Sequence, residues 1–87
     1  MIRITSIEEL KKEALYDEKK GWAEFFIVLN GGFRSSKGVA YFPDTDTFDI
    51  RNDIDDSFED DLTEEQLRND THIVLAIENG AFFKYEY

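Results

Sequence analysis

The sequence predicts an α+β fold, with a small antiparallel sheet of about four strands and helices packed on one face. Two kinds of observation lead to this prediction. Some segments begin with helix-capping residues and continue with apolar residues at helical spacing. Others are short, rich in aromatic and β-branched residues, and separated by Gly, Asn, Pro and Asp. The expected order is one helix, three strands, two helices and a final strand.

The first helix begins with a capping box, in which the Ser6 hydroxyl accepts from the Glu9 amide and the Glu9 carboxylate reaches back. Apolar residues then follow on one helical face: Ile7, Leu10, Ala14 and Leu15. We therefore predict a helix over 7–19, closed by the glycine that comes two residues later. Ahead of it, Ile2 and Ile4 form either a short edge strand or a layer packed under the helix.

The middle of the chain predicts an antiparallel meander. Residues 23–29 read as a central strand, and the Asn-Gly-Gly sequence at 30–32 accepts the positive φ of a hairpin turn. Residues 33–42 return as a second strand, and the Pro-Asp sequence at 43–46 is typical of a turn. Apolar and polar residues alternate over 48–51, so we expect a third strand with one face in water.

An acidic segment and a short helix follow. Residues 52–61 are too acidic to pack, and we predict a solvated loop there. Thr63 and Gln66 then form a second capping box, and Leu62 and Leu67 occupy the hydrophobic-staple positions on either side of it. The spacing predicts a helix of about two turns.

The C-terminal stretch fits two structures. Asp70 or Thr71 can cap a helix over 72–79, which the following glycine would end. The same residues fit a strand over 73–77 that enters an Asn-Gly hairpin turn. We favour the helix because the sequence contains both its cap and its stop, and we expect the last strand over 82–86.

Four segments resemble a family of small acidic bacterial proteins of unknown function that are often encoded near mobile elements. The segments are LNGGFRSSKGVAY at 29–41, IDDS at 54–57, LTEE at 62–65 and IENGAF at 77–82. The resemblance implies no activity. It favours a helix before the final glycine, because that stretch looks helical in these relatives.

Length and composition limit the classes of protein. We expect a single domain over 1–87, and 41% hydrophobic residues are too many for a disordered chain. The chain has no cysteine, which excludes disulfides, thiolate nucleophiles and cysteine-based zinc sites. No apolar run has the length of a signal peptide or a membrane span, so we predict a soluble cytoplasmic protein.

The charge is concentrated in one segment. Residues 44–70 contain twelve acidic side chains and two basic ones, Arg51 and Arg68. The net charge of this segment is therefore −10, which equals the formal net charge of the whole chain. Such a charge opposes binding to nucleic acids and anionic membranes. It favours a basic protein surface as the partner.

We therefore predict a non-enzymatic protein whose 44–70 surface docks on a basic partner, in its strongest form by imitating nucleic-acid phosphates. The predicted contact residues are Asp53, Asp55, Asp56, Glu59, Asp60, Asp61 and Glu64. In the alternative, the acids serve only solubility, and the protein binds through its sheet or through a hairpin at 30–38. That hairpin contains candidate contacts with anions, namely Arg34, Ser35, Ser36 and Lys37.

Other chemistry is weakly supported by the sequence. Oxygen-bearing residues recur from Asp53 with the spacing of a calcium-binding EF-hand loop, but Phe58 stands where that loop needs glycine. His72 is the single histidine, and we expect a structural role for it at a helix start. No set of nucleophile, base and oxyanion donors is recognisable, so we predict no enzyme, metal or cofactor. Trp22 is expected to be a lid on the core.

Overall fold

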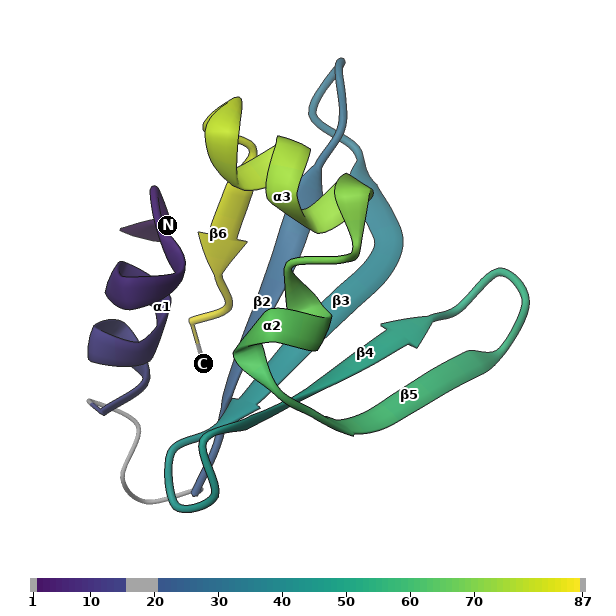
Figure 1. Cartoon of the computed structure of the whole chain (residues 1–87). Helices are drawn as coiled ribbons and strands as arrows, with labels where there is room; N and C mark the ends of the chain where they lie inside the picture. The colour runs from purple at the N-terminus through teal and green to yellow at the C-terminus, as the bar shows by residue number, and fades with distance from the viewer. Residues whose placement is uncertain (1, 16–20, 87) are drawn as a thin grey trace.

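One antiparallel sheet and three helices make up the described part of the chain, residues 2–15 and 21–86 of a computed structural model (Figure 1). The strands are β1 (Ile2–Arg3), β2 (Ala23–Val28), β3 (Arg34–Phe42), β4 (Thr47–Asn52), β5 (Ser57–Leu62) and β6 (Phe82–Lys84). The helices are α1 (Ile7–Ala14), α2 (Glu64–Leu67) and α3 (Thr71–Glu78). The sheet order is β1-β6-β2-β3-β4-β5, and the helices lie on one face, which confirms the predicted α+β class.

The meander of β2, β3 and β4 agrees with the prediction. Gly31 and Gly32 have φ of 89° and 86° in the first turn, a conformation that glycine adopts without steric cost. In the second turn Asp46 has φ of 54°, which Asp tolerates better than most residues. Short turns with the correct residues therefore fix the order of these three strands.

The prediction of a solvated loop over 52–61 is wrong. The chain turns only at 53–56, and β5 then pairs antiparallel with β4. As the edge strand, β5 receives its ladder hydrogen bonds from β4 alone, and its side chains stay in water. A strand in this position does not need apolar residues, so its acidic sequence hid it.

The predicted count of about four strands is also corrected, because β5 and β1 join the four expected strands to make six. β6 inserts between β1 and β2, which brings the two ends of the chain together. Ile4 follows β1 directly into the core, where it is completely buried. Both alternatives for the first residues are therefore realised, an edge strand and a layer under the helix.

The helix ends follow the capping signals. The Ser6 hydroxyl accepts from the Glu9 amide at 3.0 Å, and Thr63 and Gln66 form both hydrogen bonds of their capping box. The C-terminal stretch is a helix, as predicted, and its cap is Asp70, which accepts from the Ile73 amide. The last predicted residues of the first helix, 16–19, lie outside the described residues.

The core lies between the helices and the face of the sheet that they cover. Phe25, Phe48 and Phe82 are its largest buried side chains from the sheet, and α1 and α3 contribute Leu10 and Ile73. The Phe25 and Phe82 rings stack with their centroids 5.8 Å apart. In residues 2–15 and 21–86, no helix is long and apolar enough to cross a membrane.

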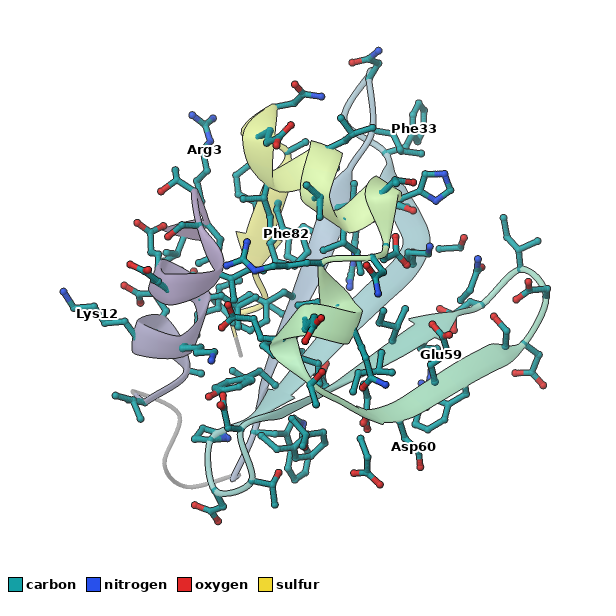
Figure 2. All side chains as sticks on the ribbon, in the orientation of Figure 1. Arg3, Lys12, Phe33, Glu59, Asp60 and Phe82 are labelled. Carbon is teal, nitrogen blue, oxygen red and sulfur yellow. The ribbon has the colours of Figure 1, made fainter. Side chains whose placement is uncertain are left out.

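Replacing Phe82 by alanine tests the role of β6 in the core. Phe82 is completely buried, and we expect Phe82→Ala to lower the free energy of unfolding by about 3–5 kcal/mol. The matched control is Phe33→Ala, because Phe33 is 73% exposed at the β2–β3 turn (Figure 2) and should change stability by no more than about 0.5 kcal/mol. Urea unfolding measures both values, and equal losses would contradict the assignment.

Candidate functional site

Six of the predicted contact residues lie together on the hairpin of β4 and β5. We call them the acidic arm: Asp53, Asp55, Asp56, Glu59, Asp60 and Asp61. The first three lie in the turn, and the other three lie on β5. All six are exposed, and the hairpin projects past the helices (Figure 1). Figure 2 shows Glu59 and Asp60 on this strand.

Local hydrogen bonds hold the turn of the arm. The Asp55 carboxylate accepts from the Ser57 amide at 2.9 Å, and the Asn52 side chain accepts from the Ile54 amide at 3.1 Å. Hydrogen bonds from the Ser57 hydroxyl and amide hold the pKa of Asp55 below its usual value. The Asp55 carboxylate is therefore charged at neutral pH.

The arm carries negative charge without compensation. Within residues 2–15 and 21–86, no ion pair joins any of its six carboxylates to a basic group. The chain from 52 to 62 contains no Lys or Arg, and Arg51 is the nearest basic residue in sequence. An anionic surface of this kind attracts cationic groups from solution.

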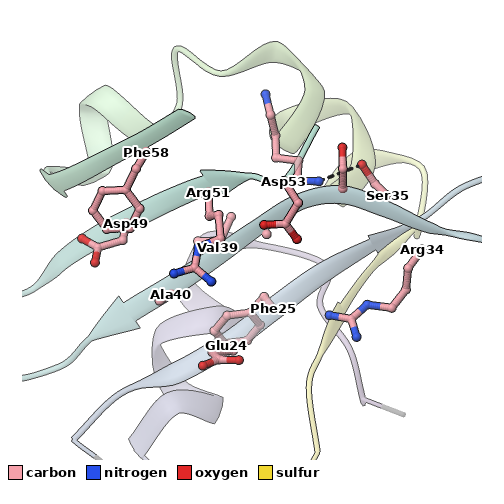
Figure 3. Close-up of a pocket in the computed structure, with 13 residues that line it drawn as sticks. Glu24, Phe25, Arg34, Ser35, Val39, Ala40, Asp49, Arg51, Asp53 and Phe58 are labelled. Atoms are coloured by element: carbon pink, nitrogen blue, oxygen red, sulfur yellow. Dashed lines mark hydrogen bonds between the residues drawn. The ribbon is translucent and has the colours of Figure 1, made fainter. Parts of the chain in front are cut away.

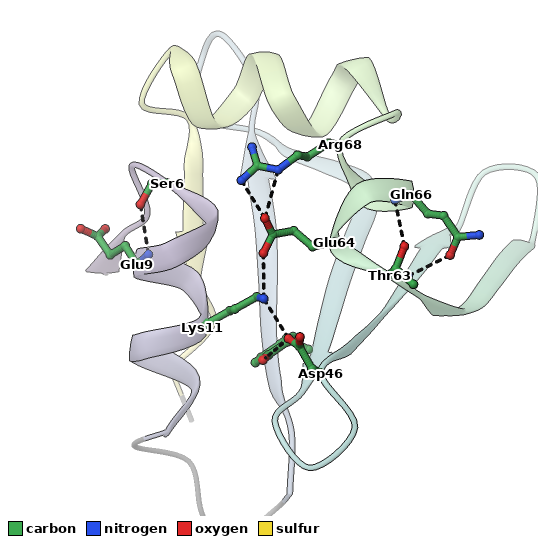
Figure 4. Close-up of polar contacts among 9 residues, drawn as sticks. Ser6, Glu9, Lys11, Asp46, Thr63, Glu64, Gln66 and Arg68 are labelled. Atoms are coloured by element: carbon green, nitrogen blue, oxygen red, sulfur yellow. Dashed lines mark hydrogen bonds and ion pairs between the residues drawn. The ribbon is translucent and has the colours of Figure 1, made fainter.

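Glu64, the seventh predicted contact residue, belongs to a different structure. At the start of α2 it accepts from Lys11 at 2.7 Å and from Arg68 at 2.9 Å, and Lys11 also pairs with Asp46 at 2.9 Å (Figure 4). Tyr41 donates its hydroxyl hydrogen to the same Asp46 at 2.7 Å. This network fastens α1 to the β3–β4 turn and to α2.

The same network shifts the pKa values of its members away from neutrality. Hydrogen bonds to Glu64 and then to Asp46 raise the pKa of Lys11 far above its usual value. Burial, and then the hydrogen bond to Asp46, raise the pKa of Tyr41 to about 12. Lys11 therefore stays charged and Tyr41 stays neutral through the physiological range, which suits a structural contact.

The residues of the predicted anion-binding hairpin are not brought together. These four residues lie at the start of β3, which begins at Arg34 within the strand predicted over 33–42. The Arg34 guanidinium lies 4.5 Å from the Phe26 ring centre, on the face of the sheet without helices. Lys37 reaches α3 on the other face, Ser35 accepts from the Lys37 amide, and the Ser36 hydroxyl donates to Asn52.

Lys37, Asp70 and His72 form a partly buried cluster at the start of α3. The Lys37 ammonium lies 2.9 Å from an Asp70 oxygen and 3.3 Å from His72 Nδ1. Burial by itself would raise the pKa of Asp70, but the hydrogen bonds from Lys37 and the Ile73 amide outweigh it and lower that pKa. His72 is exposed at the start of the helix, and Lys37 is its neighbour there.

The calcium-loop spacing from Asp53 is not realised as an EF-hand. β4 precedes it where that motif has a helix, and Phe58 lies within β5. In the described ranges, no cluster of three or more His, Asp or Glu side chains could hold a metal ion.

The sheet has a second face that no helix covers, which we call the open face. Directly opposed residues of antiparallel strands lie on the same face. The register thus places one row across all six strands of the open face: Arg3, Phe83, Phe26, Gly38, Arg51 and Phe58. The next row along β2, β3 and β4 is Glu24, Ala40 and Asp49.

A cleft of about 560 Å³ lies on the open face (Figure 3). It runs over β3, where Gly38 and Ala40 have almost no side chain, and Arg34, Arg51 and Phe58 are among the residues that line it. A second cleft, of about 520 Å³, separates the β2–β3 hairpin from α3 and includes His72 and Leu75.

The sequence did not reveal the open face. Its residues come from every strand, and two of those strands were missed or left open in the prediction. Alternation along one strand shows which of its side chains point to the same side. The strand order and register decide which residues of different strands share a face. Trp22, expected as a lid on the core, is 37% exposed and lies 6.3 Å from the Phe42 ring, measured between ring centres.

Comparisons with protein-family models, with curated proteins and with solved structures gave no match to this chain. The resemblance to proteins encoded near mobile elements therefore stays a prediction.

The Asp70 cluster predicts a pH dependence of stability. Because its pKa is lowered in the folded state, the Asp70 charge stabilises the protein above the unfolded pKa of about 3.9. That contribution disappears as the pH falls through the lower folded value. Asp70→Asn keeps a helix cap but loses the ion pair with Lys37, and we expect about 1–3 kcal/mol less stability at pH 7.

Urea unfolding of both proteins between pH 7 and pH 2.5 measures the difference. It should shrink toward zero at the acidic end, and a difference that stays constant down to pH 2.5 would contradict the assignment. Glu65→Gln is the control, because Glu65 is exposed and should change stability by no more than about 0.5 kcal/mol.

Proposed function

We propose that this is a non-enzymatic binding protein that docks its acidic arm on a basic protein surface. A single observation carries the proposal: six exposed carboxylates share one projecting hairpin, and no ion pair within the described residues neutralises them. By contrast, Asp46 and Glu64 pair with Lys11, and Asp70 pairs with Lys37. The acids of the arm are thus left for an external partner.

Electrostatics determine the kind of partner. Concentrated negative charge raises the rate at which a basic surface is encountered and suppresses encounters with acidic ones. The expected partner is a protein with a Lys- and Arg-rich surface, and a nucleic-acid-binding protein has such a surface. In that case the arm occupies the place of the phosphates and acts as an inhibitor.

The alternative is binding through the sheet or through the hairpin at 30–38, and the hairpin has less support as a site for anions. Arg34 and Lys37 reach opposite faces of the sheet, and each already contacts a partner in its own chain. Two cations that point apart do not form one cradle. The acidic arm is therefore the better-supported surface.

Neutralising the arm tests the proposal. Five carboxylates of the arm, at Asp53, Asp55, Asp56, Asp60 and Asp61, are changed to asparagine, which keeps the shape and tolerates the positive φ of Asp56 and Asp61. The matched control changes five acids outside the arm to their amides and so alters the net charge equally. These are Glu8, Glu13, Asp44, Glu65 and Glu78.

We expect a basic protein to be captured from the host lysate by the unmodified chain and by the control, but not by the arm variant. The affinity of the identified partner should fall at least tenfold between about 50 and 300 mM salt, because the contact is electrostatic. Competition with duplex DNA tests the inhibitor form. A partner held equally by the arm variant, or insensitive to salt, would refute the proposal.

A further inference from the structure

The open face carries several large aromatic side chains among its charged ones. An antiparallel sheet with helices on one side normally carries polar residues on the other. Here some outward positions hold charged residues, such as Glu24, Asp49 and Arg51. Others hold large aromatic side chains: Trp22, Phe42, Phe58, Phe83 and Tyr85. Phe26 is only 6% exposed although it lies outside the core cluster, because Arg34 and Tyr85 lie over its ring. A face of this composition resembles a surface that another molecule covers.

The basic residues of the open face support a protein contact. They are Arg3, Arg34 and Arg51, whereas the described lysines lie on α1 or on the face that the helices cover. Arginine and aromatic residues are enriched at the centres of protein interfaces, and lysine is depleted there. The acidic arm consists of Asp and Glu, which are also depleted at the centres of protein interfaces. The two surfaces therefore have different chemistry.

We infer that the open face is the interface of a homodimer, in which the open faces of two copies pack against each other. Two charges near the centre of the face are complementary under two-fold symmetry. Arg51 lies in one row and Asp49 in the next row along the same strand. A two-fold axis can lie between the two faces, perpendicular to the strands, where it passes over β3 between Gly38 and Ala40. It then places Arg51 opposite Asp49 of the second copy, and the reverse pair forms equally.

The size and shape of the face fit this occupant. The strands run from the two residues of β1 to the nine of β3, and at roughly 3.3 Å per residue and about 4.8 Å per strand they offer roughly 500 Å² per copy. The total of roughly 1,000 Å² exceeds most crystal contacts and lies near the lower limit of specific interfaces. Gly38 and Ala40 lie at the centre, where two twisted sheets approach most closely, and their small side chains permit that approach.

The salt dependence distinguishes dimerisation from binding by the arm. Each chain carries a net charge of −10, so two copies repel each other, and salt screens that repulsion. Dimerisation therefore strengthens as salt is added, whereas binding of a basic partner by the arm weakens. The dimer presents two acidic arms, but its formation does not depend on their function, and the association state tests it separately.

Sedimentation equilibrium of the whole chain, up to about 0.5 mM and at about 0.1 and 0.5 M salt, measures the association. We expect a monomer–dimer equilibrium that is tighter at the higher salt concentration. Phe58→Ser and Arg51→Glu should each weaken it at least tenfold. Phe58 is 54% exposed on the open face, and Phe33→Ser is the matched control, because Phe33 is 73% exposed away from it.

A chain that stays monomeric at both salt concentrations would overturn the inference. So would equal weakening by Phe33→Ser and Phe58→Ser, or a dimer that neither Phe58→Ser nor Arg51→Glu affects. Circular dichroism of each variant confirms that it is folded.

A cross-link provides a second test that leaves the aromatic and charged residues of the face unchanged. Because the chain has no cysteine, Ala40→Cys introduces a single thiol at the centre of the open face. A short bifunctional thiol reagent should join two copies through it. Glu65→Cys on α2 is the control, and equal yields of cross-linked dimer from both would also overturn the inference.

Discussion

The fold depends on the insertion of β6 between β1 and β2. Phe82 stacks on Phe25, its carbonyl accepts from the Ile4 amide at 2.8 Å, and the Lys84 ammonium donates to the Glu13 carbonyl at the end of α1. These contacts join the first and last segments of the chain around one core. Without β6, β1 has no strand to pair with and α1 loses a wall of its core. A domain of this size has one core, so a contact that closes it affects every other element.

The position of the acids follows from the same sheet. β5 is the outermost strand, paired only with β4, and charged side chains are tolerated there because they remain in water. Charge at an exposed edge also discourages pairing with a strand of another molecule. The acidic arm therefore protects the sheet edge, and the same charge makes it the surface most able to attract a basic protein.

The acidic arm and the open face adjoin along β5 but differ in their chemistry. The arm is anionic, so its contacts are governed by charge and by salt. The open face combines aromatic rings with arginines, of which Arg3 and Arg34 stack on rings of their own chain. Apolar burial governs contacts there, with charge setting the orientation. The two proposals therefore use different chemistry, apolar burial for the dimer and charge for the basic partner.

The sequence by itself determined the local features of this protein. Capping residues such as Ser6, Thr63 and Asp70 act within one turn, so their helices could be predicted, and so could the turns that join β2, β3 and β4. The charge of the arm was equally visible, although its strand was not, because pairing with β4 rather than local sequence makes β5 a strand. Only the tertiary structure decided the strand order, the separation of Arg34 from Lys37 and the composition of the open face. Each of these depends on which distant strands pair and in which register, and a shift of one residue would exchange the two faces of a strand.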